Sequence, residues 1–137
     1  MNDDKRILLY FRDANLASLL TEYMHTRGMP VVSLDYSENI IAALQNDNYD
    51  VLIMESDSSA SSRLCDLYAV RLVANMLPVI LVASSDTSSA AAVDAYKYGA
   101  DLVLRRPFSL DELWHRLQVC FRYSDTTATP DISAATQ

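Results

Sequence analysis

Glycine is very scarce in this sequence, which has only Gly28 and Gly99 among its 137 residues. Loops that hold phosphate groups through their backbone need several glycines close together, so the sequence excludes a nucleotide-binding loop of that kind. Each glycine follows a segment with helical spacing of apolar residues, where a helix commonly ends in a left-handed residue. We therefore expect both glycines to terminate helices.

Positive charge is also sparse, because 11 Lys and Arg stand against 18 Asp and Glu and leave a formal net charge of -7. A surface with this charge repels the phosphate backbone of nucleic acids. We therefore expect the direct partners of this segment to be proteins.

Cysteine and histidine occur twice each, in positions that do not indicate a site. Cys65 and Cys120 lack the spacing of metal ligands, and His25 and His115 fall in segments predicted to be helical. The sequence has no signal peptide and no long apolar span. We expect a cytoplasmic protein with reduced thiols and without membrane contact, metal, cofactor or enzymatic activity.

Five short apolar runs predict β-strands, at residues 7–11, 31–34, 51–55, 79–83 and 102–104. The helices between and after them are expected to begin near Asn15, Ser37, Arg63, Ser88 and Ser109. This alternation predicts an α/β fold, a doubly wound parallel sheet of five strands with five helices on its two faces. Residues 124–137 show no periodicity and predict a flexible linker or tail.

The run at residues 51–55 ends in an acid, Glu55. A strand that is apolar at every position is typical of the middle of a parallel sheet, where both faces are covered. Ligands of open α/β sheets bind beyond the carboxyl ends of the strands, so Glu55 lies at the default position of a functional site. Taken alone, it suggests a catalytic nucleophile.

Four stretches together resemble the receiver domain of bacterial two-component response regulators, over roughly residues 5–123. They are residues 6–9, 49–54, 78–82, and 98–101 continuing to 106–109. The last of these, with Glu112-Leu113 after it, looks most like the winged-helix (OmpR/PhoB-type) subfamily. The resemblance implies a flavodoxin-like (CheY-like) fold with strand order 2-1-3-4-5. It also implies that residues 1–123 form the receiver domain and that 124–137 lead to a C-terminal DNA-binding domain, through which alone we expect contact with DNA.

Receivers of this family phosphorylate an aspartate at the end of the third strand, with Mg²⁺ held by an acidic pair after the first strand. The matching positions here depart from that pattern. Phe11 and Arg12 replace the acidic pair, Asp13 is acidic but one residue late, and Glu55 replaces the phosphoacceptor. A carboxylate-poor pocket that contains Arg12 is expected to bind Mg²⁺ very weakly.

The two remaining family positions, a Thr or Ser after the fourth strand and a Lys before the cis-proline, also differ. Ala83 takes the hydroxyl position, although Ser84 is adjacent, and Arg106 takes the lysine position. We therefore interpret these residues as a pseudo-active site in which Glu55 pairs with Arg12 and Arg106 and mimics a phosphorylated aspartate. Simple decay of the site, or its reuse for another ligand, are the alternatives.

Active winged-helix receivers dimerise through the face of the fourth helix, fifth strand and fifth helix. Asp101, Glu112 and Arg116 keep charges of that face, while Ala92, Leu102 and Gln118 replace others. Val103 stands where the family has an aromatic residue that swings inward on activation. A homodimer through this face is expected, with a solvated monomer as the alternative.

The resemblance therefore implies an atypical receiver that signals and dimerises without phosphorylation and controls transcription through an attached DNA-binding domain. A stand-alone adaptor or decoy that binds a protein partner is the second hypothesis, and the sensor kinase stays open. An enzyme that uses the same crevice lacks support, because neither His25 nor His115 is predicted near the strand ends.

Overall fold

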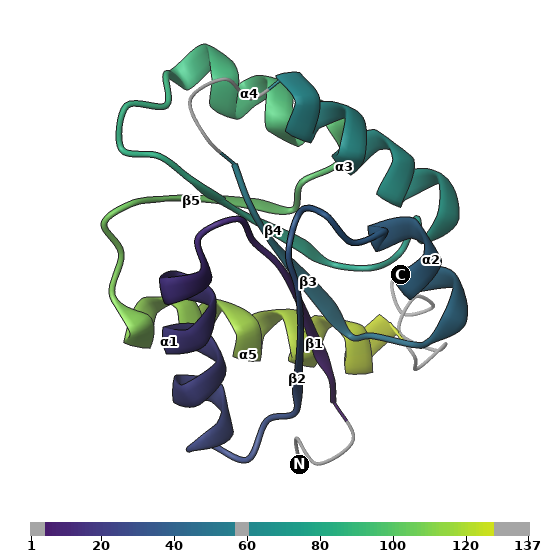
Figure 1. The fold of residues 1–137 in the computed structure, drawn as a ribbon, viewed down its shortest axis with the longest axis vertical. Helices are drawn as coiled ribbons and strands as arrows, with labels where there is room; N and C mark the ends of the chain where they lie inside the picture. Colours follow the sequence, from purple (N-terminus) through teal and green to yellow (C-terminus); the bar gives the residue numbers. More distant parts are fainter. Residues whose placement is uncertain (1–4, 57–60, 128–137) are drawn as a thin grey trace, which may run out of the picture.

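The computed structural model describes residues 5–56 and 61–127, and these form an α/β domain with a five-stranded parallel sheet. The strands are β1 (Ile7–Tyr10), β2 (Val31–Leu34), β3 (Val51–Glu55), β4 (Val79–Ala83) and β5 (Leu102–Arg105). Their order across the sheet is β2-β1-β3-β4-β5, all pairs parallel (Figure 1). The predicted fold class and strand order are confirmed.

Five helices cover the two faces of the sheet, as the strand–helix alternation predicts. They are α1 (Ala14–His25), α2 (Ile40–Asn46), α3 (Ser61–Val73), α4 (Ser89–Tyr98) and α5 (Leu110–Thr127). Helices α1 and α5 lie on one face, and α2, α3 and α4 on the other (Figure 1). Alternate strand residues enter different cores, so that Leu9 packs with α1 and α5 while Leu8 packs on the opposite side. This two-sided burial explains why the strands are apolar at successive positions.

Side chains at the helix N-termini accept hydrogen bonds from backbone N–H groups that the helix leaves open. Asp13 caps α1, Ser88 caps α4, and the Ser109 hydroxyl accepts from Glu112 N at 3.0 Å at the start of α5. At the other ends, Gly28 and Gly99 have φ values of 74° and 125°, which confirms their predicted role as helix terminators.

The cap of α2 differs from the prediction. Asn39, and not Ser37, accepts from the N–H groups of Ile41 and Ala42. The Ser37 hydroxyl instead donates to the Asp35 carboxylate in the preceding turn, because a short polar side chain readily bonds to a neighbour two residues away. Helix α2 is therefore shorter than expected.

Two other helix boundaries also differ. Helix α5 continues to Thr127, four residues past the predicted end of the receiver domain at Tyr123, because the sequence has no Gly or Pro to stop it before Pro130. Helix α3 begins at Ser61, two residues before the predicted start near Arg63, and ends at Val73. The predicted tail beyond residue 127 and most of the polar loop before α3 lie outside the described residues. Within those residues, no helix is long and apolar enough to cross a membrane.

The side chain of Arg71 joins the ends of α3 and α4 to the sheet, and we call this group of contacts the Arg71 clamp. Its Nε and Nη2 donate to the Gly99 carbonyl at 2.9 and 2.7 Å, and Nη1 donates to the Leu77 carbonyl at 2.6 Å. Nη2 also lies 2.7 Å from the Asp101 carboxylate, which in turn accepts from Val79 N. One guanidinium thus satisfies carbonyls that two helix ends leave open.

Candidate functional site at the carboxyl ends of the strands

Glu55 ends β3 in the centre of the sheet and is 5 % exposed. Its Oε1 accepts hydrogen bonds from the backbone N–H groups of Arg12 and Asp13, at 2.7 and 2.9 Å. Its Oε2 lies 2.5 Å from Nη2 of Arg106. A buried carboxylate is costly unless it is paired and hydrogen-bonded, and here both oxygens are engaged.

Arg106 follows β5 and is held over the site by its own backbone, because its N–H donates to the Ala83 carbonyl at 2.9 Å. Its guanidinium bridges two acids: Nη2 meets Glu55, and Nη1 lies 3.6 Å from Oδ2 of Asp13. The side chain of Arg106 is 32 % exposed, so the ion pair sits at the edge of the solvent and not deep inside the domain. The predicted pairing of Glu55 with Arg106 is present in the structure.

The predicted contribution of Arg12 takes a different form. Arg12 is exposed, and it bonds to Glu55 through its backbone N–H. The backbone donates because α1 begins directly after the turn that follows β1. The successive N–H groups of residues 12 and 13 therefore point toward the end of β3. Sequence reasoning considered side chains, and it therefore missed the main chain as the donor.

The other predicted members of the site do not meet Glu55 through their side chains. Phe11 is 1 % exposed and packs in the core between the sheet and α1. Ala83 is buried at the end of β4, and the Ser84 hydroxyl donates to Asp86 at 2.6 Å within the following loop. Strand β4 ends at Ala83, so the adjacent Ser84 does not take the hydroxyl position at the end of this strand.

Tyr36 belongs to the site, and sequence reasoning missed it. Its hydroxyl donates to the backbone carbonyl of Glu55, and its ring lies 4.9 Å from the Tyr10 ring, centroid to centroid. The loop after β2 is thereby fixed to the end of β3. A tyrosine in a polar loop gives no local signal of this contact.

The residues of this site do not fit the Mg²⁺ that the fold family implies. Such a site needs one or two carboxylates with free oxygens, but Glu55 is engaged by three donors and Asp13 caps α1 through Oδ1. In the described ranges, no group of three or more His, Cys, Asp or Glu side chains could hold a metal ion. The same engagement makes Glu55 a poor nucleophile, because its lone pairs already accept charge-assisted hydrogen bonds.

The residues predicted for a dimer face lie along α4, β5 and α5. Glu112 and Arg116 are exposed, and Ala92, Leu102 and Gln118 are half-buried. The Asp101 carboxylate is held by the Arg71 clamp within the same chain. The predicted pair between Asp101 and Arg116 of a second copy would therefore compete with this internal bond.

No family model matches the chain. It is similar to the transcriptional regulatory protein RprY of Bacteroides fragilis, with 27% identity over 122 residues that cover 89% of this chain and 51% of the relative. It also matches the DNA-binding transcriptional regulator NtrC of Salmonella typhimurium, with 31% identity over 101 residues, 73% of this chain and 21% of the relative. The chain thus spans about half the length of the first relative and about a fifth of the second.

Solved structures show the same fold. The receiver domain of the Francisella response regulator 1452 has a TM-score of 0.75 at 20% identity, covering 88% of this chain and 99% of that one. An atypical orphan response regulator, described as having a phosphorylation-independent regulatory mechanism, has a TM-score of 0.73 at 18% identity, covering 86% and 96%. The chain thus has the fold of response-regulator receiver domains, and over most of its length its sequence is similar to parts of two transcriptional regulators.

Proposed function

We propose that this receiver domain signals without phosphorylation, from a conformation that the Glu55–Arg106 pair holds fixed. The observation that carries the proposal is the state of the Glu55 carboxylate, whose two oxygens are engaged by two backbone N–H groups and a guanidinium. In a phosphorylated receiver these elements would meet a charged phosphoryl group. Glu55 is one methylene longer than aspartate, and it places a carboxylate paired with Arg106 at that position.

The neighbouring positions support a single conformation. Ala83 is buried and has no hydroxyl that could follow a phosphoryl group, and Val103 has no ring that could swing inward. The Val103 N–H also donates to the Tyr96 hydroxyl at 3.0 Å, which ties β5 to α4. A ligand can shift a conformational equilibrium only through contacts that differ between two states. Ala83 and Val103 provide no such contact that would change when phosphate binds.

Incubation with acetyl phosphate and Mg²⁺ is expected to leave the mass of the protein unchanged, because the nucleophile is engaged and the site does not fit the metal. Intact-mass spectrometry measures this, with a receiver that carries the full family pattern as the positive control. Gain of one phosphoryl group, mapped by peptide analysis to Glu55 or to Asp57, would refute the proposal.

Dimerisation through the face of α4, β5 and α5 is the second part of the proposal. The charged ring of the winged-helix subfamily is incomplete here, and Asp101 is occupied by Arg71. Where the charged ring is incomplete, the face presents apolar side chains. Val93, Tyr96 and Val119 are 50%, 45% and 47% exposed. Exposed ion pairs contribute only about 0–1 kcal/mol each, so an apolar centre can replace several of them.

Val119→Glu is expected to convert a dimer into a monomer, because it places a charge in the apolar centre of the interface. Sedimentation analysis across a concentration series measures the dimer dissociation constant. Leu19→Glu is the matched control, since Leu19 is 50% exposed on α1, a helix that is not part of this face. A wild-type chain that is monomeric throughout, or equal effects of both substitutions, would count against this face.

The proposed output is control of transcription through an attached DNA-binding domain of the winged-helix type. Both curated relatives are transcriptional regulators by name, and both are longer than this chain. NtrC is of a different subfamily, so the winged-helix assignment rests on residues 98–113 of the sequence. The negative charge of this domain agrees with an output that reaches DNA through a different, basic segment.

A further inference from the structure

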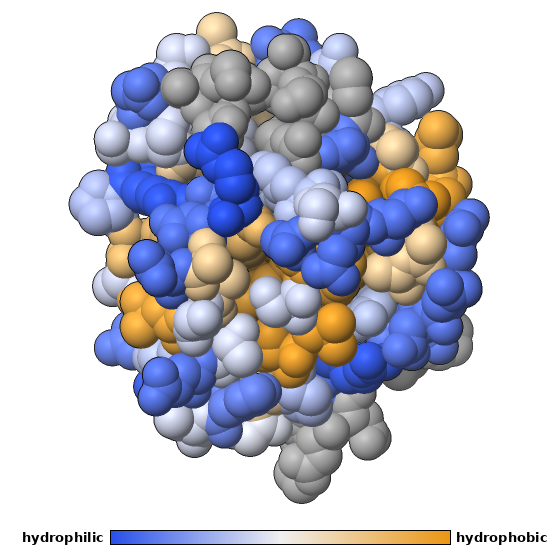
Figure 2. Space-filling model, in the orientation of Figure 1, coloured by the Kyte–Doolittle hydropathy of each residue, from blue (hydrophilic) through white to orange (hydrophobic). Residues whose placement is uncertain are grey.

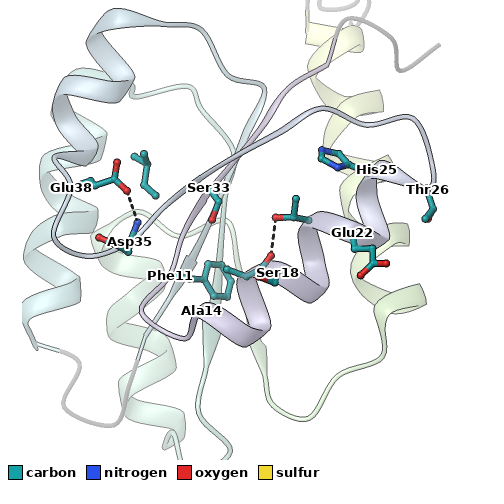
Figure 3. Close-up of a pocket in the computed structure, with 12 residues that line it drawn as sticks. Phe11, Ala14, Ser18, Glu22, His25, Thr26, Ser33, Asp35 and Glu38 are labelled. Atoms are coloured by element: carbon teal, nitrogen blue, oxygen red, sulfur yellow. Dashed lines mark hydrogen bonds between the residues drawn. The ribbon is translucent and has the colours of Figure 1, made fainter.

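A groove of about 710 Å³ runs between α1 and the β2 edge of the sheet, beside the Glu55 site. One wall is formed by α1 and by Phe11, which precedes this helix. The other wall is formed by β2 and the loop that leads to α2 (Figure 3). Its lining includes the apolar residues Phe11, Ala14 and Ala17 and the acids Glu22, Asp35 and Glu38. In Figure 2 an apolar area lies in the middle of this face, between α1 and α2, and hydrophilic residues frame it.

The charges around the groove have one sign. Glu22, Asp35 and Glu38 are exposed acids in its walls, and the lining contains neither Lys nor Arg. Hydrogen bonds from Ser37 lower the pKa of Asp35, so this carboxyl is charged at neutral pH. Glu38 uses one oxygen to accept from Asp35 N at 3.1 Å, which leaves the other directed to solvent or a ligand.

Arg27 follows Thr26 of the lining, but its guanidinium contacts residues on the α5 side of α1. The Arg27 guanidinium stacks 3.8 Å from the centroid of the Tyr23 ring and 5.4 Å from that of Trp114. It also lies 3.9 Å from Asp111 on α5. The ion pair of Arg27 is thus made with Asp111 on α5, while its Nη1 donates to the Thr26 hydroxyl at 3.4 Å.

The β2 wall also offers backbone hydrogen bonds. β2 is the edge strand, and the carbonyls of Pro30 and Leu34 accept from Ile7 and Phe11 on its β1 side. Because backbone groups alternate along a strand, Val31 and Ser33 direct their N–H and C=O groups to the outer edge. Residues 31–34 include no Lys and no Pro, which commonly protect such an edge from pairing with another strand.

We propose that this groove binds an extended, Lys- or Arg-bearing segment of a partner protein, which pairs with the outer edge of β2 as a sixth strand. Apolar side chains of the segment would cover the floor formed by Phe11, Ala14 and Ala17. Its basic side chains would reach Glu22 and Glu38 on the two walls. Strand addition of this kind combines main-chain hydrogen bonds for affinity with alternate side-chain contacts for specificity. The proposal is independent of the state of Glu55.

The test uses the 137-residue chain and a fluorescein-labelled octapeptide of alternating lysine and valine, with binding followed by fluorescence anisotropy at low salt. The double substitution Glu22→Gln/Glu38→Gln is expected to weaken binding about tenfold, the usual combined effect of two exposed ion pairs. The amide that replaces the Glu38 carboxylate can still accept from Asp35 N, so the loop is retained. Asp86→Asn/Asp94→Asn removes the same charge from the loop before α4 and from α4, outside the groove, and is expected to change the affinity far less.

Two peptide variants test the strand pairing without altering the protein. Replacing lysine by glutamate is expected to abolish binding, and N-methylation at alternate residues is expected to weaken it about tenfold by removing hydrogen bonds. Amide NMR shifts on binding should centre on Val31, Ser33 and α1. Equal losses for the two double substitutions would show unspecific charge attraction, and an N-methylated peptide that binds unchanged would exclude strand addition. Either result, or no binding of the lysine peptide, would overturn the proposal.

Discussion

Replacing Arg71 with alanine is expected to lower the free energy of unfolding by about 3–5 kcal/mol, among the largest effects of any single substitution in this chain. The guanidinium makes hydrogen bonds to the carbonyls of Gly99 and Leu77 and to the Asp101 carboxylate. The side chain of Arg71 is 18% exposed, so water would replace these bonds incompletely. Urea or guanidinium denaturation followed by circular dichroism measures the change.

Arg71→Lys is expected to recover only a part of this loss, because an ammonium group cannot reach several carbonyls in different directions as a planar guanidinium does. Arg116→Ala is the control, because Arg116 is an exposed arginine on α5, and its loss should change stability by less than about 0.5 kcal/mol. Similar small effects of both alanine substitutions would mean that the Arg71 clamp contributes little.

Gly99 provides an independent check of the same contact. A Cβ at this position would lie 2.5 Å from Cγ of Arg71, and the φ of 125° is unfavourable for any side chain. Gly99→Ala should therefore be more destabilising in the wild-type chain than in the Arg71→Ala variant, where the steric part disappears. Equal costs in both backgrounds would show that backbone strain alone accounts for the effect.

Arg106→Ala is expected to lower the free energy of unfolding by about 2–3 kcal/mol, because it leaves the buried Glu55 carboxylate without its cation. We place the effect below that of a fully buried pair, since the Arg106 side chain is 32% exposed and water can partly replace it. The same denaturation assay applies. Arg105→Ala is the matched control, as the adjacent Arg105 is exposed and donates to the Thr87 carbonyl at 3.1 Å.

Adding Glu55→Gln to Arg106→Ala should restore part of the lost stability, because a neutral amide needs no counter-ion.

The single substitution Glu55→Gln separates phosphate mimicry from decay of the site. If the charge carries the signal, this substitution weakens dimerisation even where the domain stays folded. If the site has merely decayed, the dimer dissociation constant does not change.

Much of the fold could be predicted because its signals are local. Strands buried on both faces must be apolar at nearly every position, and helix ends need a capping side chain or a left-handed residue. The runs that became β1, β3 and β4, the Ser88 and Ser109 caps, and the two glycines all follow these rules. Where two polar residues competed for one role, as Ser37 and Asn39 did before α2, local rules did not decide between them.

Glu55 and Arg106 were predicted as a pair because the resemblance to receivers assigned both to one pocket. The remaining parts of the site were not predicted, because they involve backbone groups or residues far apart in the sequence. The N–H groups of Arg12 and Asp13 act whatever their side chains are, and Tyr36 meets Glu55 across 19 positions. No local pattern encodes such contacts.

By itself, the sequence determined the strand–helix alternation, the strand order through its family resemblance, and the loss of the acidic pair, the phosphoacceptor aspartate and the lysine. Only the tertiary structure decided that Arg12 serves through its main chain, that Arg71 secures the end of α4 across 28 positions, and that α1 and β2 enclose an acidic groove. The physical reason is that hydrophobic periodicity and caps act within a few residues, whereas hydrogen-bond partners and cavities are set by how the helices pack on the sheet.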